Sequence, residues 1–202
     1  GGYFGFIGGQ PRLNLVALDL TTGLANSWDP SIGGGGVICL ATDGSGNIYA
    51  GGDFISVGWS KRKFIAAFNA TTGQVTSWAP EASNIVEELA FFNNTVYAGG
   101  NFSSIGGQSR NRIAGLNTTN GNATTFNPNP SAFAHIGDIV AANNLIYVGG
   151  NFTSIGGQSK NNLAALDPTT GNATTWNPNP SSQVDAIAIK DNTAYIGGYF
   201  TS

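Results

Sequence analysis

The sequence is poor in the residues on which most catalytic and redox chemistry depends. Its 202 residues include one cysteine, Cys39, one histidine, His135, and no methionine. A single cysteine excludes a disulfide framework and argues against a cysteine-based metal site. A single histidine excludes histidine-cluster metal sites, and no motif places a triad partner for His135. We therefore expect no catalytic residue, no metal and no cofactor, and we expect Cys39 to be buried and inert.

Charge and long apolar stretches are also scarce. Only 9% of the residues are charged, whereas about 25% is typical of soluble domains. The net charge of -3 gives no global attraction to nucleic acid or to anionic lipid. No run of about 18 apolar residues occurs, so we expect no membrane span. Since 41% of the residues are hydrophobic, the chain can still fold around a sizeable core.

A repeat of 48 or 50 residues organises the chain. Its signature, Gly-Gly-x-Phe, occurs at Gly1–Phe4, Gly51–Phe54, Gly99–Phe102, Gly149–Phe152 and Gly197–Phe200. A period of this length is typical of propellers and arrays. The sequence predicts a single repeat domain over residues 1–202, with repeats 1–50, 51–98, 99–148 and 149–196 and a further repeat that starts at 197–202. Because the chain lacks methionine and opens within a repeat, we interpret it as a piece of a longer protein.

Each repeat is predicted to contain four short strands. In the last full repeat, the run Leu163–Asp167 and the segment around Trp176 flank a turn that ends at Gly171. A second hairpin joins Val184–Ile189 to a run that ends at Gly198. These runs are β-branched and aromatic and are separated by Gly, Asn and Pro, and no helical period is present. Four strands in such a repeat match one propeller blade.

The repeat resembles a known blade. A strand that ends in Tyr-x-Gly-Gly, then a strand that ends in Asp or Asn, then a turn and Trp, resembles the kelch blade and is similar to the central propeller of galactose-oxidase-type proteins. It looks closest to the Asn- and Gly-rich propeller repeats of secreted bacterial surface proteins. The resemblance covers essentially the whole chain. It implies an all-β propeller of four-stranded blades, complete or an excerpt of a larger propeller or array, with Val184–Ile189 innermost and the Trp176 segment outermost. A galactose-oxidase copper site would need two histidines, so that activity is not expected.

Two further motifs have structural interpretations. One aromatic residue follows the turn of every repeat at a fixed offset: Trp28, Trp78, Phe126 and Trp176. We expect these four side chains to be buried between blades rather than to stack on a ligand. Asp43–Asn47 looks like the start of a calcium loop, but it lacks the glutamate that an EF-hand requires seven residues later. Turn chemistry is the favoured interpretation of this segment.

Basic residues concentrate in one loop type, between the diglycine strand and the third strand. They are Arg12, Lys61, Arg62, Lys63, Arg110, Arg112 and Lys160. Because loops of one type share a face in a propeller, we expect these residues on one face with their charged tips in water. Trp59 lies among them and replaces a glycine found in the other repeats. The pattern favours either a binding face for an acidic glycan or acidic partner, or a solvated loop face without a ligand.

Three functions fit the sequence. The favoured hypothesis is a non-catalytic structural module, extracellular or at the cell surface, that assembles with copies of itself or with adjoining repeats of a longer chain. The first alternative is a lectin-like glycan-binding propeller that uses Trp59 and the basic loops. The second is a non-catalytic part of a larger secreted enzyme. A large interface through strand edges would favour the scaffold, whereas a pocket of Trp59 and basic side chains would favour the lectin.

Overall fold

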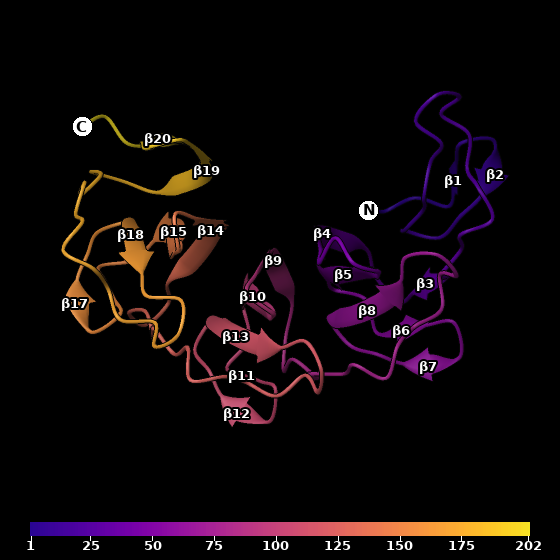
Figure 1. Cartoon of the computed structure of the whole chain (residues 1–202), viewed down its shortest axis with the longest axis horizontal. Coiled ribbons are helices and arrows are strands. Elements are labelled where there is room, and N and C mark those ends of the chain that lie inside the picture. Colours follow the sequence, from indigo (N-terminus) through magenta and orange to yellow (C-terminus); the bar gives the residue numbers. More distant parts are fainter.

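The chain is an all-β propeller, as the sequence predicts. The computed structural model describes residues 1–202 and contains twenty β-strands and no helix (Figure 1). It accordingly has no helix of the length and apolarity that a bilayer crossing requires. Figure 1 shows the sheets following one another as blades along an arc, with the C-terminal strands β19 and β20 at one end and β1 and β2 at the other.

Three successive blades each contain a sheet of three antiparallel strands. The first blade consists of β4 (Val37–Thr42), β5 (Asn47–Gly52) and β8 (Ile65–Asn69). The second consists of β9 (Val86–Phe92), β10 (Thr95–Gly100) and β13 (Ile113–Asn117). The third consists of β14 (His135–Ala142), β15 (Leu145–Asn151) and β18 (Leu163–Leu166). Because β4, β9 and β14 contact one another from blade to blade, these strands line the inner side of the arc.

The fourth strand of each repeat is shorter than the sequence predicts. The stretch that carries the recurring aromatic residue pairs through one β-bridge per repeat: Leu18 with Ala25, Phe68 with Val75, Leu116 with Ala123, and Leu166 with Ala173. The bridge is soon followed by Pro and Asn, as in Asn127–Pro130. Proline has no N–H for a strand ladder, and Asn129 has a positive φ of 44°. We call this stretch the outer segment of each blade.

A small hairpin joins the second and third strands of every repeat, and this element was not predicted. The four hairpins are β1 (Phe6–Ile7) with β2 (Gln10–Pro11), β6 (Ser56–Val57) with β7 (Ser60–Lys61), β11 (Ser104–Ile105) with β12 (Gln108–Ser109), and β16 (Ser154–Ile155) with β17 (Gln158–Ser159). Three of them turn through two glycines with positive φ, which is the residue choice that a tight hairpin favours. β3 (Ile32–Gly33) pairs with β6.

The core lies between neighbouring blades. Trp28, Trp78 and Phe126 are buried, which confirms the packing role predicted for them. Within a blade, Tyr49 meets Trp78 edge to face, with ring centroids 5.1 Å apart. The diglycines allow close approach of the next blade, since a Cβ on Gly99 would lie 2.7 Å from the Ile136 side chain.

The two ends of the arc are incomplete blades. At the C-terminal end, β19 (Val184–Lys190) and β20 (Thr193–Gly198) form a two-stranded sheet. At the N-terminal end, a small hairpin and an outer segment are present without inner strands. Leu18 is 39% exposed although the equivalent Leu116 is 0% exposed, and Tyr195 is 59% exposed although the equivalent Tyr97 is 1% exposed. Trp176, expected to be buried, is only half-buried because the next blade is not complete.

Candidate functional site

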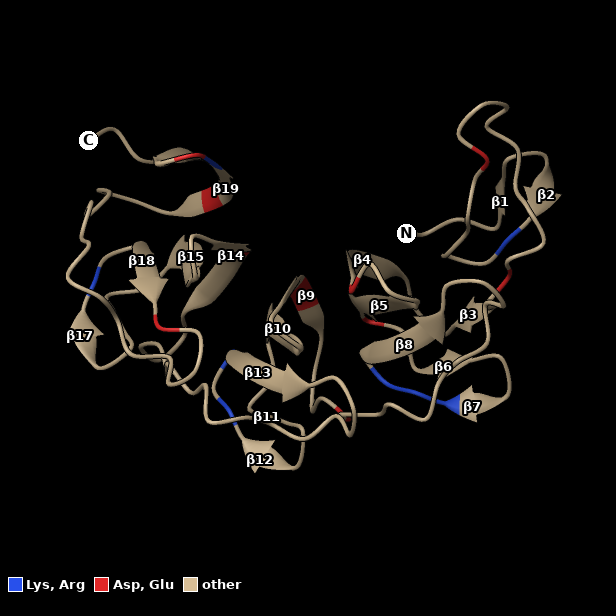
Figure 2. Cartoon of the chain, in the orientation of Figure 1, with Lys and Arg blue, Asp and Glu red and all other residues tan.

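The arginine that follows a small hairpin holds the outer segment of its own blade. One guanidinium nitrogen donates to a backbone carbonyl of that segment in three repeats: Arg12 to Asn26 at 2.6 Å, Arg62 to Thr76 at 3.3 Å, and Arg110 to Thr124 at 2.7 Å. Figure 2 shows basic segments at the corresponding points after β2, β7, β12 and β17. These cations thus supply hydrogen bonds where the outer segment has no strand ladder.

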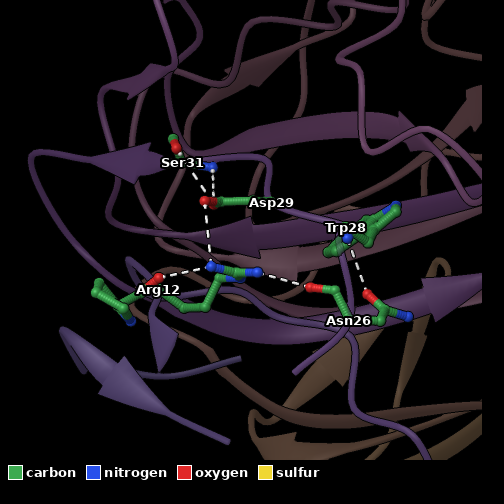
Figure 3. Close-up of polar contacts among 6 residues, drawn as sticks. Arg12, Asn26, Trp28, Asp29 and Ser31 are labelled. Carbon is green, nitrogen blue, oxygen red and sulfur yellow. Dashed lines mark hydrogen bonds and ion pairs between the residues drawn. The ribbon is translucent and has the colours of Figure 1, made fainter. Parts of the chain in front are cut away.

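A second guanidinium nitrogen of the same arginines closes the hairpin. Arg12 donates to the Pro11 carbonyl at 2.8 Å, and its guanidinium lies 3.7 Å from the Asp29 carboxylate (Figure 3). Asp29 in turn accepts hydrogen bonds from the backbone and hydroxyl of Ser31, both at 3.2 Å. This ion pair is the only one in the structure. The charged tip of Arg12 is therefore bound by groups of the protein itself.

Lys160 corrects the expectation that the basic tips point into water. Its side chain is only 4% exposed, and Nζ donates to the Trp176 carbonyl at 2.9 Å. It occupies the position that Arg12, Arg62 and Arg110 occupy in the other repeats. The prediction failed because the sequence does not reveal that the outer segment leaves carbonyl groups for a cation to satisfy.

Arg112 also serves the scaffold. It has a positive φ of 63°, as do the equivalent Asn14, Phe64 and Asn162, at 64°, 66° and 62°. Its guanidinium donates to the Asn101 side chain at 2.7 Å. The role of this position is therefore to turn the chain into the third strand of the blade.

The side chains of three of the eight candidate residues make no hydrogen bond within the protein. Trp59, Lys61 and Lys63 are exposed on and directly after the β6–β7 hairpin of the first blade. A cavity of about 370 Å³ opens there, lined by Lys61, Arg62, Lys63, Ile65, Ala79, Glu81 and Ala82. The structure thus gathers the free cations at one hairpin rather than around the whole loop face.

Acidic groups gather on the inner strands instead. Glu88 on β9 and Asp138 on β14 occupy equivalent positions, and Asp138 accepts a hydrogen bond of 2.6 Å from the Ile187 amide of the next blade. Burial, together with the negative charges of Asp138 and Glu87, raises the pKa of Glu88 to about 7. Burial also raises the pKa of Asp138. Sequence reasoning missed this pair, although the equivalence of the two positions in the repeat could have revealed it.

The remaining candidates have local structural roles. Burial raises the pKa of the Cys39 thiol well above its usual range, so the reactive thiolate is disfavoured. Against the upward effect of burial, hydrogen bonds from the side chain and backbone amide of Asn47 and from Ser45 lower the pKa of the Asp43 carboxylate, which also accepts from the Gly46 amide. This is the turn chemistry that the sequence favours for the segment. Nowhere does the structure bring together three His, Cys, Asp or Glu side chains that could hold a metal ion.

Comparison of the sequence with family models supports the fold. Residues 93–123 and 141–172 match the family described as "Domain of unknown function (DUF5122) beta-propeller". The first segment runs from the turn between β9 and β10 to the bridge residue Ala123, and the second runs from the last two residues of β14 to the residue before the bridge residue Ala173. A comparison with curated proteins finds no match.

Solved structures share the fold at low sequence identity. The chain is similar to the computationally designed Ika4 protein, with a TM-score of 0.54, 17% identity, and coverage of 80% of this chain and 84% of that one. For the designed Ika8 protein the TM-score is 0.55 and the identity 13%, over 93% of this chain and 64% of that one. For the extracellular domain assigned to the one-component system BT4673 from B. thetaiotaomicron the TM-score is 0.51 and the identity 15%, over 95% of this chain and 22% of that one.

Proposed function

We propose that the chain is a non-catalytic structural module, extracellular or at the cell surface, that associates end to end with copies of itself or with adjoining repeats. The observation that carries the proposal is the complementarity of its two ends. β19 and β20 are the first two strands of a blade. The N-terminal residues contain a small hairpin, a run equivalent to the third strand, and an outer segment. Apart from the Gly-Gly-x-Phe segment, which both ends carry and of which only one copy fits in a completed blade, each end lacks what the other end has.

The strand register of the complete blades specifies how the two ends would pair. In the second blade, Thr95 lies opposite Asn117 and Tyr97 opposite Gly115. The equivalent residues at the ends place Thr193 opposite Asp19 and Tyr195 opposite Ala17. This pairing would cover Leu18 and Tyr195, two large side chains left in water at the ends. Unpaired strand edges and exposed apolar side chains are the features that drive such association.

The recurring indole supports the same geometry. Nε1 of Trp28 donates to the Asn69 carbonyl of the next blade at 3.0 Å, and Nε1 of Trp78 to the Asn117 carbonyl at 2.9 Å. The equivalent nitrogen of Trp176 has no acceptor in the chain. In a blade completed by the N-terminal residues of another copy, the carbonyl of Asp19 would occupy the acceptor position. The indole thus adds a specific polar contact to the apolar ones.

The surface location rests on composition and on one likeness. The charged fraction of 9% and the abundance of Gly, Asn and Thr suit a durable scaffold that needs no titratable active site. One structural neighbour is the extracellular domain of a one-component system. The occupied tips of Arg12, Arg62, Arg110 and Lys160 also favour a scaffold, since most cations of the loop face stabilise the blades.

Mass and shape in solution test this proposal. Light scattering and small-angle X-ray scattering over a range of concentrations should show particles that grow with concentration. Leu18→Asp or Tyr195→Asp should reduce them to monomers, because each variant buries a charge in the new interface. Thr119→Asp in an exposed turn is the matched control and should leave assembly unchanged. An open monomer at all concentrations would contradict the proposal, and so would a compact closed monomer whose ends pair within one chain.

A disulfide tests the register itself. Ala17 and Tyr195 are predicted to lie directly opposite each other, within the Cα separation that a disulfide spans. A chain with Ala17→Cys and Tyr195→Cys should form covalent oligomers under mild oxidation, visible on a non-reducing gel. Cysteines at Ala17 and Ile189 are the mismatched control, because Ile189 lies on β19 rather than β20. Equal crosslinking of both pairs would show non-specific collision.

A further inference from the structure

The β6–β7 hairpin of the first blade departs from the repeat in sequence. The other three small hairpins read Ile-Gly-Gly-Gln, whereas residues 57–60 read Val-Gly-Trp-Ser. In those three, the carbonyl of the first turn glycine accepts the backbone N–H of the outer segment: Gly8 from Ala25, Gly106 from Ala123, and Gly156 from Ala173, each at 2.9 Å. The equivalent bond from Val75 to Gly58 is not formed. The tip of this hairpin is therefore released from its outer segment, and the Arg62 bond to the Thr76 carbonyl after the hairpin remains.

Packing around the turn confirms the release. A Cβ added to Gly106 or Gly156 would clash with the backbone of the outer segment, whereas at Gly58 it would meet nothing within 4 Å. A second tether, formed in the third blade alone, is also absent. The Gln158 side chain donates to the Ala173 carbonyl at 2.9 Å, and Ser60 stands at the equivalent position with a side chain too short to reach.

The tip of the released hairpin is shifted by one residue along the end of the preceding blade's outer segment. Gly106 and Gly156 donate to the carbonyls of Pro80 and Pro128, whereas Gly58 donates to Ser31, one residue further along the equivalent segment, at 2.9 Å. In addition, β6 pairs with β3, and no other small hairpin has such a partner strand. The pairing of β6 with β3 thus holds the hairpin in its shifted position.

The shift opens a cleft of about 430 Å³ between the hairpin and residues 72–75. Four groups at this cleft make no hydrogen bond within the protein: the Val75 amide, the Gly58 carbonyl, the Ser60 hydroxyl and the Gln74 side chain. They offer both donors and acceptors to a ligand. Trp59 lies on the rim with its indole in water, and Asp29, which is paired with Arg12, also lines the cleft. Lys61 and Lys63 follow Trp59 in the chain without any ion pair and line the neighbouring cavity of about 370 Å³, together with Glu81.

This combination of groups has the chemistry of a sugar site. An indole has a broad apolar face for a pyranose ring, free amide and hydroxyl groups match sugar hydroxyls, and unpaired lysines attract carboxylate or sulfate groups. We propose that this cleft binds an acidic oligosaccharide, with Trp59 stacked on a pyranose ring and the sugar chain continuing toward the neighbouring cavity, where Lys61 and Lys63 would meet its anionic groups. The volume of the cleft lies within the range of about 300–1,000 Å³ that is typical of small-ligand sites.

Calorimetric titration of the whole chain tests the proposal. The probes are a tetramer of galacturonic acid, a sulfated heparin tetrasaccharide and the neutral cellotetraose. Either acidic probe should bind more tightly than cellotetraose, and its affinity should fall as salt rises, because exposed charges are screened over about 8–10 Å at 0.1–0.15 M. Trp59→Ala should weaken binding at least ~10-fold, since an aromatic side chain that becomes buried against its ligand is a typical hot spot. Lys61→Gln with Lys63→Gln should remove the preference for the acidic probe.

Two variants distinguish the effect of the open cleft from the effect of the Trp59 side chain. Trp59→Gly with Ser60→Gln restores the sequence of the other repeats and should close the cleft and abolish binding. Gly107→Trp places an indole on the β11–β12 hairpin, which is still tethered, and should create no second site. Unfolding midpoints should be unchanged in Trp59→Ala, because the side chain touches solvent. Equal affinity for cellotetraose, binding unaffected by Trp59→Ala, or retention of a protein partner instead of a sugar would overturn the proposal.

Discussion

The indole nitrogen of Trp78 donates a hydrogen bond of 2.9 Å to the carbonyl oxygen of Asn117, which belongs to the next blade. The same ring meets Tyr49 of its own blade edge to face at 5.1 Å. One side chain therefore joins the second strand of one blade to the outer turn of the following one. The contact is polar at one end and apolar along its length, so both components can be tested separately.

Trp78→Ala should lower the free energy of unfolding by roughly 3–5 kcal/mol, because it removes a buried aromatic side chain from the blade interface. Trp78→Phe should cost only about 1 kcal/mol, the typical value of one hydrogen bond, since Phe126 fills the equivalent place without a donor. Urea unfolding of both variants measures the two values. A loss below about 1 kcal/mol for Trp78→Ala would contradict the packing role.

Lys160→Ala should destabilise the third blade by about 1–3 kcal/mol, because the Trp176 carbonyl loses the ammonium that donates to it. Lys160→Arg should retain most of the stability, since arginine fills this position in the other three repeats. The double variant Lys61→Ala with Lys63→Ala is the control. Both side chains are exposed, so it should stay within about 0.5 kcal/mol of the parent chain. Equal effects in both cases would refute the structural role of Lys160.

Gly156→Ala and Gly58→Ala separate packing from backbone strain. Both glycines have positive φ, 61° and 50°, so both variants carry the same cost of about 1 kcal/mol for the left-handed backbone. Only at Gly156 does the new Cβ clash with the outer segment. Gly156→Ala should therefore cost about 1–3 kcal/mol more than Gly58→Ala in chemical unfolding. Equal costs would mean that the β6–β7 hairpin is tethered like the others.

The pKa of Glu88, raised from its ordinary value of 4.5 to about 7, makes stability depend on pH. Between these two values the folded chain holds a proton that the unfolded chain has released. The free energy of unfolding contributed by this group is thus fully present below about pH 4.5 and is lost as pH rises toward 7. Unfolding midpoints measured from pH 4 to 8 should fall over this window. Glu88→Gln should reduce that fall, leaving the part that the raised pKa of Asp138 contributes, whereas Glu81→Gln at an exposed loop should preserve it.

The period of the sequence was sufficient to predict the blades. The diglycine spacing located every second strand, and Val184–Ile189 was predicted as a strand that the structure extends to Lys190. The burial of Trp78 followed from its constant offset after the turn. These predictions succeeded because a feature that recurs in every repeat reflects a contact that every blade must make.

Features that depend on distant backbone groups could not be predicted in the same way. The fourth strand was overestimated, because a run with one bridge has the same composition as a regular strand. Lys160 was assigned to solvent, since nothing local to it indicates that the Trp176 carbonyl lies within reach. The cleft beside Trp59 was only partly anticipated. The substitution of Trp59 for glycine is visible in the sequence, but the displaced hairpin and the cleft are not.

Only a few hydrogen bonds join each small hairpin to the rest of its blade. A hairpin tip can therefore change in evolution without a change in the sheet. In the first blade the hairpin is shifted, yet Tyr49 still pairs with Ala67 as Tyr97 pairs with Gly115 in the second blade. Mutations at a hairpin tip therefore change one surface loop while the frame keeps its geometry. Duplication of the repeat supplies several such tips, and each can drift toward its own ligand without loss of the others.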